Sequence, residues 1–217
     1  MTGLSVIPAR VRTKVCGLIQ PEDALAAVNA GVDALGLVFY PPRPRFVTPK
    51  QAASILEQLP PFVVTVVLFV NPEPEWVEEV LKQVPLDLLQ FHGNEPEAFC
   101  QAFGRPYIKA LRMKPGFDPQ QAVSQWPSAR GFLLDTYTPG VPGGTGEAFD
   151  WQRFPSHDSK ANKAYSWILA GGLTPDNVTE AIRITHPYAV DVSGGVESSR
   201  GIKCPTKIHA FLKAVRS

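Results

Sequence analysis

Two glycine pairs follow apolar segments in the last third of the chain. Gly171-Gly172 comes after the segment Trp167–Ala170, and Gly194-Gly195 comes after Tyr188–Val192. Backbone N–H groups in such turns cradle phosphate oxygens, and glycine allows a close approach because it has no side chain. One pair alone is equally typical of a tight turn. Two pairs after two such segments favour a phosphate-bearing ligand.

Two side chains capable of acid–base chemistry also stand at the ends of apolar segments. Cys16 ends a segment that begins at Thr13, and Asp135 ends one that begins at Phe132. A thiolate can remove a proton, and a carboxyl group can donate one, when their pKa values are shifted. Simpler interpretations remain open, since a cysteine there is more often a small buried hydrophobic residue and an aspartate often caps a turn. His92 likewise has two interpretations, as a site residue or as a structural histidine.

Composition narrows the class of protein. The 217 residues are 44% hydrophobic and 19% charged with a net charge of +1, which is typical of a globular chain and does not favour nucleic-acid binding. No apolar run is long enough to cross a membrane, and residues 1–11 do not resemble an export signal. Three irregularly spaced cysteines and no spaced set of ligands predict neither a disulfide framework nor a metal site. We therefore expect a cytoplasmic protein. Its expected partner is a phosphorylated small molecule, and its expected assembly is a monomer or a homodimer.

The elements that position these residues alternate regularly along the chain. The predicted strands are Thr13–Gly17, Ala34–Phe39, Val63–Val70, Leu86–Phe91, Tyr107–Met113, Gly131–Asp135, Trp167–Ala170 and Tyr188–Val192. The predicted helical segments are Pro21–Ala30, Pro49–Leu59 capped by Thr48, Pro72–Val84, Glu95–Phe103, Asp118–Gln125, a poorly defined region around Asp150–Phe154, Pro175–Ile184 capped by Thr174, and Lys203–Val215.

Strict alternation of strands and helices predicts parallel strands with right-handed crossovers. Eight units predict an α/β fold with one (β/α)8 TIM barrel over residues 1–217, and an open doubly wound sheet is the alternative. In such a barrel the loops after the strands build the active site. The candidate residues would then gather on one face.

Strand parity adds one neighbour relationship. Alternate side chains point into a barrel, so Lys14 shares a face with Cys16, and Asp191 shares a face with Ser193. The first and eighth strands are neighbours in a closed barrel. We therefore expect Lys14 to lie near Asp191 at the barrel mouth, where Lys14 could also help to lower the pKa of Cys16.

Motifs along nearly the whole chain resemble the phosphoribosylanthranilate isomerase family of the tryptophan pathway. They are Lys14-Val15-Cys16-Gly17, Phe39-Tyr40, Arg45-Phe46-Val47, Phe69-Val70-Asn71, Leu89-Gln90-Phe91-His92-Gly93, Leu133-Leu134-Asp135-Thr136, Gly143-Gly144-Thr145-Gly146, Phe149-Asp150-Trp151, Leu169-Ala170-Gly171-Gly172-Leu173, Asp191-Val192-Ser193 and Gly195-Val196-Glu197. Each motif is weak alone, and the set in this order is specific.

The resemblance implies a reaction and a role for several residues. The reaction is the Amadori rearrangement of N-(5-phosphoribosyl)anthranilate, which uses no cofactor. Cys16 would be the general base and Asp135 the general acid, while Arg45 would hold the anthranilate carboxylate. The turns at Gly172 and at Gly194-Gly195 would hold the phosphate. The expected substrate-binding set also includes His92, Asp191 and Gly171.

Three positions depart from the family pattern, namely Gly194 for a common serine, Glu147 for a common lysine and Leu68 for a common glycine. None of them is an acid–base residue. The nearest alternative enzyme is a relative of indole-glycerol-phosphate synthase, which relies on lysines for acid–base chemistry. A phosphosugar-binding barrel without catalysis is a second alternative. A histidine-pathway ribotide as an additional substrate would need a second phosphate site. The glycine pairs indicate only a single phosphate site.

Overall fold

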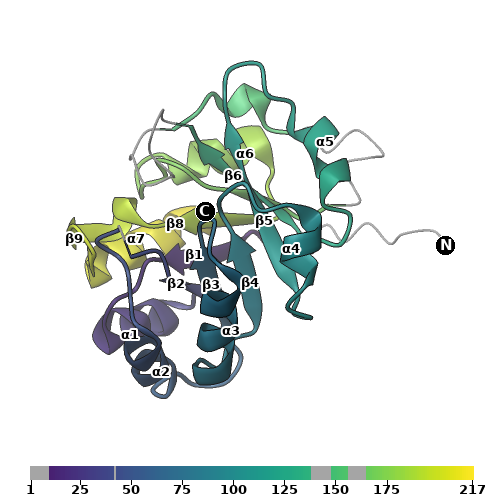
Figure 1. The fold of residues 1–217 in the computed structure, drawn as a ribbon. Helices are drawn as coiled ribbons and strands as arrows, with labels where there is room; N and C mark the ends of the chain where they lie inside the picture. Colours follow the sequence, from purple (N-terminus) through teal and green to yellow (C-terminus); the bar gives the residue numbers. More distant parts are fainter. Residues whose placement is uncertain (1–9, 42, 138–147, 156–164) are drawn as a thin grey trace.

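Eight parallel strands close into a barrel with the helices around its outside (Figure 1). The computed structural model describes residues 10–41, 43–137, 148–155 and 165–217. The strands follow one another around the barrel in chain order from β1 to β8, and β8 pairs with β1. This closure confirms the predicted barrel and rules out an open sheet.

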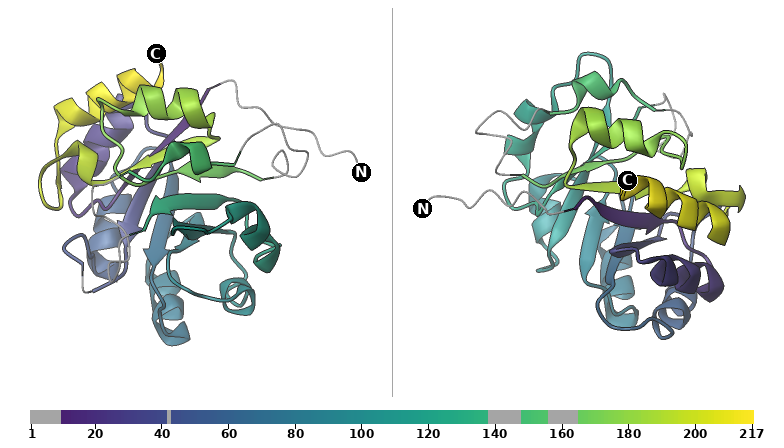
Figure 2. Two further views of the ribbon diagram at one scale, coloured as in Figure 1. Left: turned by 90° about the horizontal axis from the view of Figure 1, so that it is seen from above. Right: turned by 180° about the vertical axis from the view of Figure 1, so that it is seen from behind.

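The strands are β1 (Arg12–Cys16), β2 (Ala34–Val38), β3 (Val64–Phe69), β4 (Leu88–Phe91), β5 (Tyr107–Met113), β6 (Phe132–Thr136), β7 (Trp167–Leu169) and β8 (Ala189–Val192). The α-helices are α1 (Pro21–Ala30), α2 (Pro49–Leu56), α3 (Pro74–Gln83), α4 (Glu97–Gln101), α5 (Pro119–Ala122), α6 (Val178–Thr185) and α7 (Pro205–Val215). The views in Figure 2 show α7 beside α1, so the last helix packs next to the first.

Local sequence signals set several of these boundaries. Thr48 and Gln51 form a capping box at the start of α2, as the predicted cap at Thr48 requires. Helix α1 ends at Gly31, whose φ of 89° is a left-handed conformation that glycine adopts without strain. None of the helices in the described part of the chain has the length and apolarity needed to span a membrane.

The prediction for the helix after β7 was wrong at its start. Helix α6 begins at Val178 with Asn177 as its N-cap residue, so Thr174 does not cap it. The Asn177 side chain accepts a hydrogen bond from the Thr174 N–H at 2.8 Å and donates one to the Gly172 carbonyl at 2.9 Å. These bonds hold the intervening residues in a turn that is tied to the loop after β7.

Two connections also differ from strict alternation. Among the described residues between β6 and β7, the regular element is the 3-10 turn η2 (Trp151–Arg153) rather than an α-helix. After β8 come the 3-10 turn η4 (Gly194–Val196) and a hairpin of β9 (Glu197–Ser199) and β10 (Ile202–Lys203), which the sequence did not predict. Most of the glycine-rich loop at 136–146, with its Gly143–Gly146 motif and the neighbouring Glu147, lies outside the described residues.

The barrel interior is apolar at its N-terminal end and more polar at its C-terminal end. The N-terminal part is filled by a small apolar cluster that includes Ile108, Leu133 and Ile168. Towards the C-terminal ends of the strands, the buried interior contains Cys16 packed in a cluster with Leu68. The apolar cluster therefore forms a closed floor beneath the polar end of the barrel.

A buried ion pair fixes the loops after β3 and β4. Lys109 Nζ lies 2.8 Å from Glu95 Oε2, and the two side chains are only 1% and 2% exposed. Glu95 also accepts hydrogen bonds from the N–H groups of Asn71 at 2.7 Å and Gly93 at 2.9 Å. One carboxylate therefore connects β5 to the segments that follow two other strands, including the loop directly after His92.

We predict that Glu95→Gln lowers the free energy of unfolding by about 3–5 kcal/mol, because it leaves the Lys109 ammonium buried without its counter-ion. Urea denaturation followed by circular dichroism measures this loss. Glu180→Gln is the matched control, since Glu180 pairs with Arg183 on the exposed face of α6 and should show no measurable change. Equal midpoints for the two variants would contradict the role given to Glu95.

Candidate active site

A pocket of about 430 Å³ opens at the C-terminal ends of the strands. Its lining contains all nine site residues predicted from the sequence: Cys16, Arg45, His92, Asp135, Gly171, Gly172, Asp191, Gly194 and Gly195. They come from β1, β6 and β8 and from the loops after β2, β4, β7 and β8. The barrel thus gathers into one cavity residues that are up to 179 positions apart (195 − 16).

Cys16 lies at the end of β1 beside a buried ion pair. Lys14 Nζ is 2.9 Å from Asp191 Oδ2, with 6% and 9% of the two side chains exposed, which confirms the expected proximity. Space for the thiol comes from Gly36 on β2, where an added Cβ would lie 2.7 Å from Cys16 Sγ. Any larger residue at position 36 would displace the sulfur from the pocket.

Burial has a larger effect on the pKa of Cys16 than Lys14 has. Burial raises the pKa of the Cys16 thiol, and this desolvation outweighs the opposing influence of Lys14. The nearby Asp191 carboxylate also raises the pKa of Cys16. Lys14 therefore acts in the direction expected from the sequence and moderates the rise in the pKa of Cys16.

Asp135 is oriented by a chain of hydrogen-bonding groups from β4. Gln90 Nε2 lies 3.0 Å from His92 Nδ1, and His92 Nε2 lies 3.1 Å from Asp135 Oδ2. An amide nitrogen donates, so Nδ1 accepts, and the neutral ring carries its proton on Nε2 and donates it to the carboxylate. The other oxygen, Asp135 Oδ1, accepts the N–H of Thr136 at 2.8 Å. His92 is thus a pocket residue in contact with the candidate acid.

The guanidinium of Arg45 reaches the pocket but is already paired. Its Nε and Nη2 donate to the two oxygens of Glu197 at 2.7 and 2.8 Å, and Lys203 Nζ donates to the same carboxylate at 2.9 Å. Sequence reasoning missed the roles of Glu197, Lys203 and Gln90. Glu197 and Gln90 stood within family motifs, but the contact between Glu197 and Arg45 joins residues 152 positions apart.

The glycine turns pack against the acid and against each other. Gly171 has a φ of 82°, and a Cβ at this position would lie 2.9 Å from Asp135 Oδ1. A Cβ at Gly195 would lie 1.9 Å from the Leu173 carbonyl oxygen, so the loops after β7 and β8 are in direct backbone contact. Only glycine permits this approach, which brings the two turns together on one side of the pocket.

Within the ranges that the structure describes, no group of three or more His, Cys, Asp or Glu is arranged to hold a metal ion.

Comparison with known proteins gives consistent results over nearly the whole chain. The family described as "N-(5'phosphoribosyl)anthranilate (PRA) isomerase" matches residues 13–214. An N-(5'-phosphoribosyl)anthranilate isomerase of Pseudomonas fluorescens (strain Pf0-1) is 60% identical over 206 residues, which are 95% of this chain and 98% of that protein. The chain is also similar to the crystal structure of phosphoribosyl anthranilate isomerase from Thermotoga maritima, with 39% identity, a TM-score of 0.83 and coverage of 94% and 98%.

Two further solved structures add a ligand and an assembly. One is phosphoribosyl anthranilate isomerase in complex with reduced 1-(o-carboxyphenylamino)-1-deoxyribulose 5-phosphate, at 38% identity and a TM-score of 0.77. The other describes monomers generated from the dimeric isomerase of Thermotoga maritima, at 35% identity and a TM-score of 0.77. Each covers 94% of this chain and 98% of its own.

We predict different pH dependences for alkylation of Cys16 and Cys204 by iodoacetamide. Burial raises the pKa of Cys16, whereas the hydrogen bond with Thr206 is the main cause that lowers the pKa of Cys204. The thiolate is the reacting form, so the midpoint of the pH–rate profile should lie at a higher pH for Cys16 than for Cys204. Peptide mapping by mass spectrometry measures both rates in one sample. A Cys16 midpoint at or below that of Cys204 would refute the assigned direction.

Proposed function

Because the chain belongs to the N-(5'-phosphoribosyl)anthranilate isomerase family, we propose that Cys16 and Asp135 perform the two proton transfers of its reaction. The reaction is the Amadori rearrangement of N-(5'-phosphoribosyl)anthranilate to 1-(2-carboxyphenylamino)-1-deoxyribulose 5-phosphate, a step of tryptophan synthesis. The observation that carries the proposal is the presence of both groups in one pocket with the glycine turns.

Asp135 acts first, as the general acid. Its proton goes to the oxygen of the ribose ring, the bond from that oxygen to C1 breaks, and a Schiff base forms between C1 and the anthranilate nitrogen. Asp135 is buried beside His92, and its charge is one cause, after desolvation, of the raised pKa of Asp191. The Asp135 carboxyl group lines the pocket, where it can deliver a proton to the ring oxygen of a bound substrate.

Cys16 then acts as the general base. It removes the proton from C2 of the Schiff base, and the electron pair of that C–H bond moves towards the iminium nitrogen to give the enamine. The raised pKa of Cys16 disfavours the thiolate. The iminium cation reverses this preference, since an adjacent positive charge stabilises the thiolate and also acidifies the C2 proton.

The remaining contacts bind the two anionic ends of the substrate. The backbone N–H groups of the turns at Gly172 and Gly194-Gly195 hold the phosphate, which glycine lets approach closely. Arg45 holds the anthranilate carboxylate, for which a planar guanidinium gives a bidentate match. Gly171, His92 and Asp191 complete the substrate-binding set.

We predict that Cys16→Ala and Asp135→Asn each lower kcat by about 10²–10⁴-fold, because each removes a proton-transfer group. The loss of substrate fluorescence measures turnover. Cys204→Ala and Asp176→Asn are matched controls outside the pocket and should keep the kcat of the unmodified enzyme. A near-normal kcat in either pocket variant would remove that residue from the mechanism.

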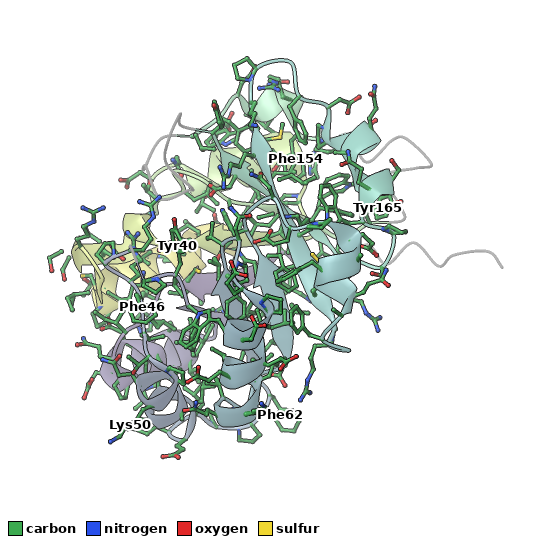
Figure 3. The ribbon with its side chains drawn as sticks, viewed as in Figure 1. Tyr40, Phe46, Lys50, Phe62, Phe154 and Tyr165 are labelled. Carbon is green, nitrogen blue, oxygen red and sulfur yellow. The ribbon has the colours of Figure 1, made fainter. Side chains whose placement is uncertain are left out.

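A homodimer is the proposed assembly, formed through the N-terminal end of the barrel. Phe62 in the loop before β3 is fully exposed, has a strained φ of 71°, and lies at the lower edge of the molecule in Figure 3. Val64, which begins β3, is 42% exposed nearby, and a groove of about 650 Å³ at this end is lined by Pro60, Pro61 and Leu86. A second copy can place its Phe62 in this groove reciprocally, and the isomerase of Thermotoga maritima is described as dimeric.

We predict that Phe62→Asn shifts the protein towards a monomer, because the apolar anchor is lost while asparagine tolerates the positive φ. Sedimentation velocity at micromolar concentrations measures the shift. Turnover should be retained, since the pocket lies at the other end of the barrel. A wild-type protein that sediments as a monomer at every concentration would overturn the proposed dimer.

The proposal also covers the domain organisation and the cellular location. Residues 1–217 form one domain, which the packing of α7 beside α1 supports. The protein acts in the cytoplasm, where the reducing conditions suit its three free cysteines.

A further inference from the structure

Three side chains next to the pocket form a buried ionic cluster, which consists of Arg45, Glu197 and Lys203. The Glu197 carboxylate lies between the two cations, 2.7 Å from Arg45 Nε and 2.9 Å from Lys203 Nζ. Exposure of the side chains falls from 15% for Arg45 to 7% for Glu197 and 0% for Lys203. The cluster therefore runs from the pocket wall into the protein.

Glu197 uses only one edge of the Arg45 guanidinium. A guanidinium has five N–H donors in one plane, and Glu197 takes the side edge formed by Nε and Nη2. The end edge, formed by Nη1 and the second N–H of Nη2, has the same fork geometry and matches another carboxylate. Arg45 can thus bind Glu197 and a ligand carboxylate at the same time.

The stem of Arg45 is confined as well. Gly17, with a φ of 78°, leaves room for it, since a Cβ there would lie 2.4 Å from Arg45 Cδ. On the other side, a Cβ at Gly194 would lie 3.3 Å from Arg45 Nη2. The guanidinium is therefore held between the loops after β1 and β8, and Glu197 sets its rotation.

Glu197 is itself held by the β9–β10 hairpin, in which it pairs directly with Lys203. Lys203 Nζ also donates to the Ser193 carbonyl at 3.2 Å, and the Lys203 N–H donates to Asp23 Oδ2 at 2.8 Å. Burial acts to raise the pKa of Glu197, but Arg45 and Lys203 outweigh it and lower the pKa. The group that orients Arg45 is thus a fixed carboxylate at neutral pH.

We propose that Glu197, fixed by Lys203 on the β9–β10 hairpin, is the positioning residue that turns the free edge of Arg45 towards a substrate carboxylate. This inference rests on the proposed role of Arg45. A mobile Arg45 would be attracted by either anionic end of the substrate, the carboxylate or the phosphate. The Nη2 atom of Arg45 already lies beside the Gly194 turn, where the phosphate would bind. The bond to Glu197 reserves the guanidinium for the carboxylate.

Two stable ligands that differ by one group test the proposal. The first is reduced 1-(o-carboxyphenylamino)-1-deoxyribulose 5-phosphate, and the second is the same compound without the carboxylate. Calorimetry gives the Kd of both for the wild type, Glu197→Gln, Arg45→Ala and the double variant. Glu180→Gln on exposed α6 is the matched carboxylate control and should bind both ligands like the wild type.

For Glu197→Gln we expect the Kd of the carboxylated ligand to rise about 10–100-fold, the range for losing a charge-assisted hydrogen bond. The Kd of the ligand without the carboxylate should stay within about twofold of wild type. In the Arg45→Ala background, Glu197→Gln should add nothing further, because Glu197 acts only through Arg45. Glu197→Asp, which keeps the charge but shortens its reach, should give an intermediate loss and serves if Glu197→Gln does not fold.

The outcomes separate this inference from the function on which it rests. Equal weakening of both ligands, or no weakening, in the Glu197 variants would overturn the positioning role. Additive effects of the Arg45 and Glu197 substitutions would overturn it too. If Arg45→Ala itself does not discriminate between the ligands, the carboxylate role of Arg45 fails first.

Discussion

Lys14 and Asp191 face each other across the seam at which β1 closes the barrel against β8, with 2.9 Å between Nζ and Oδ2. Both charges are almost wholly buried, so each would be costly without the other. The two residues are also register partners in the sheet. A slip of one residue would turn both charges away from each other and place apolar side chains in the barrel. The pair thus disfavours any other register.

The geometry of the site follows from that register. With Lys14 inside, Cys16 also points inside, and Ser193 on the neighbouring segment reaches back to donate a hydrogen bond to the Cys16 carbonyl at 2.9 Å. The pocket wall then needs small residues at specific places. Gly36 leaves room for the sulfur, and Gly171 lets the loop after β7 approach Asp135. Positions without side chains are therefore as specific as those that carry the chemistry.

The sequence predicted most of what depends on local pattern and on strand parity. The proximity of Lys14 and Asp191 could be expected because it depends only on the alternation of side chains along a strand and on the closure of the barrel. The Arg45–Glu197 bond could not, since Arg45 lies in a loop and Glu197 lies in a two-stranded hairpin that no alternating pattern predicts. The start of α6 was missed because the Asn177 side chain, not that of Thr174, ends the turn. The raised pKa of Cys16 could not be predicted from the sequence because desolvation depends on three-dimensional packing.

Most of the charged side chains around the pocket are paired with a side chain of opposite charge. With every carboxyl group ionised, three buried or nearly buried cations face three anions: Lys14, Arg45 and Lys203 against Asp135, Asp191 and Glu197. Two further cations, Arg43 and Arg200, line the pocket, and Arg200 is exposed. Attraction therefore acts mainly at the entrance, whereas recognition inside depends on oriented N–H donors.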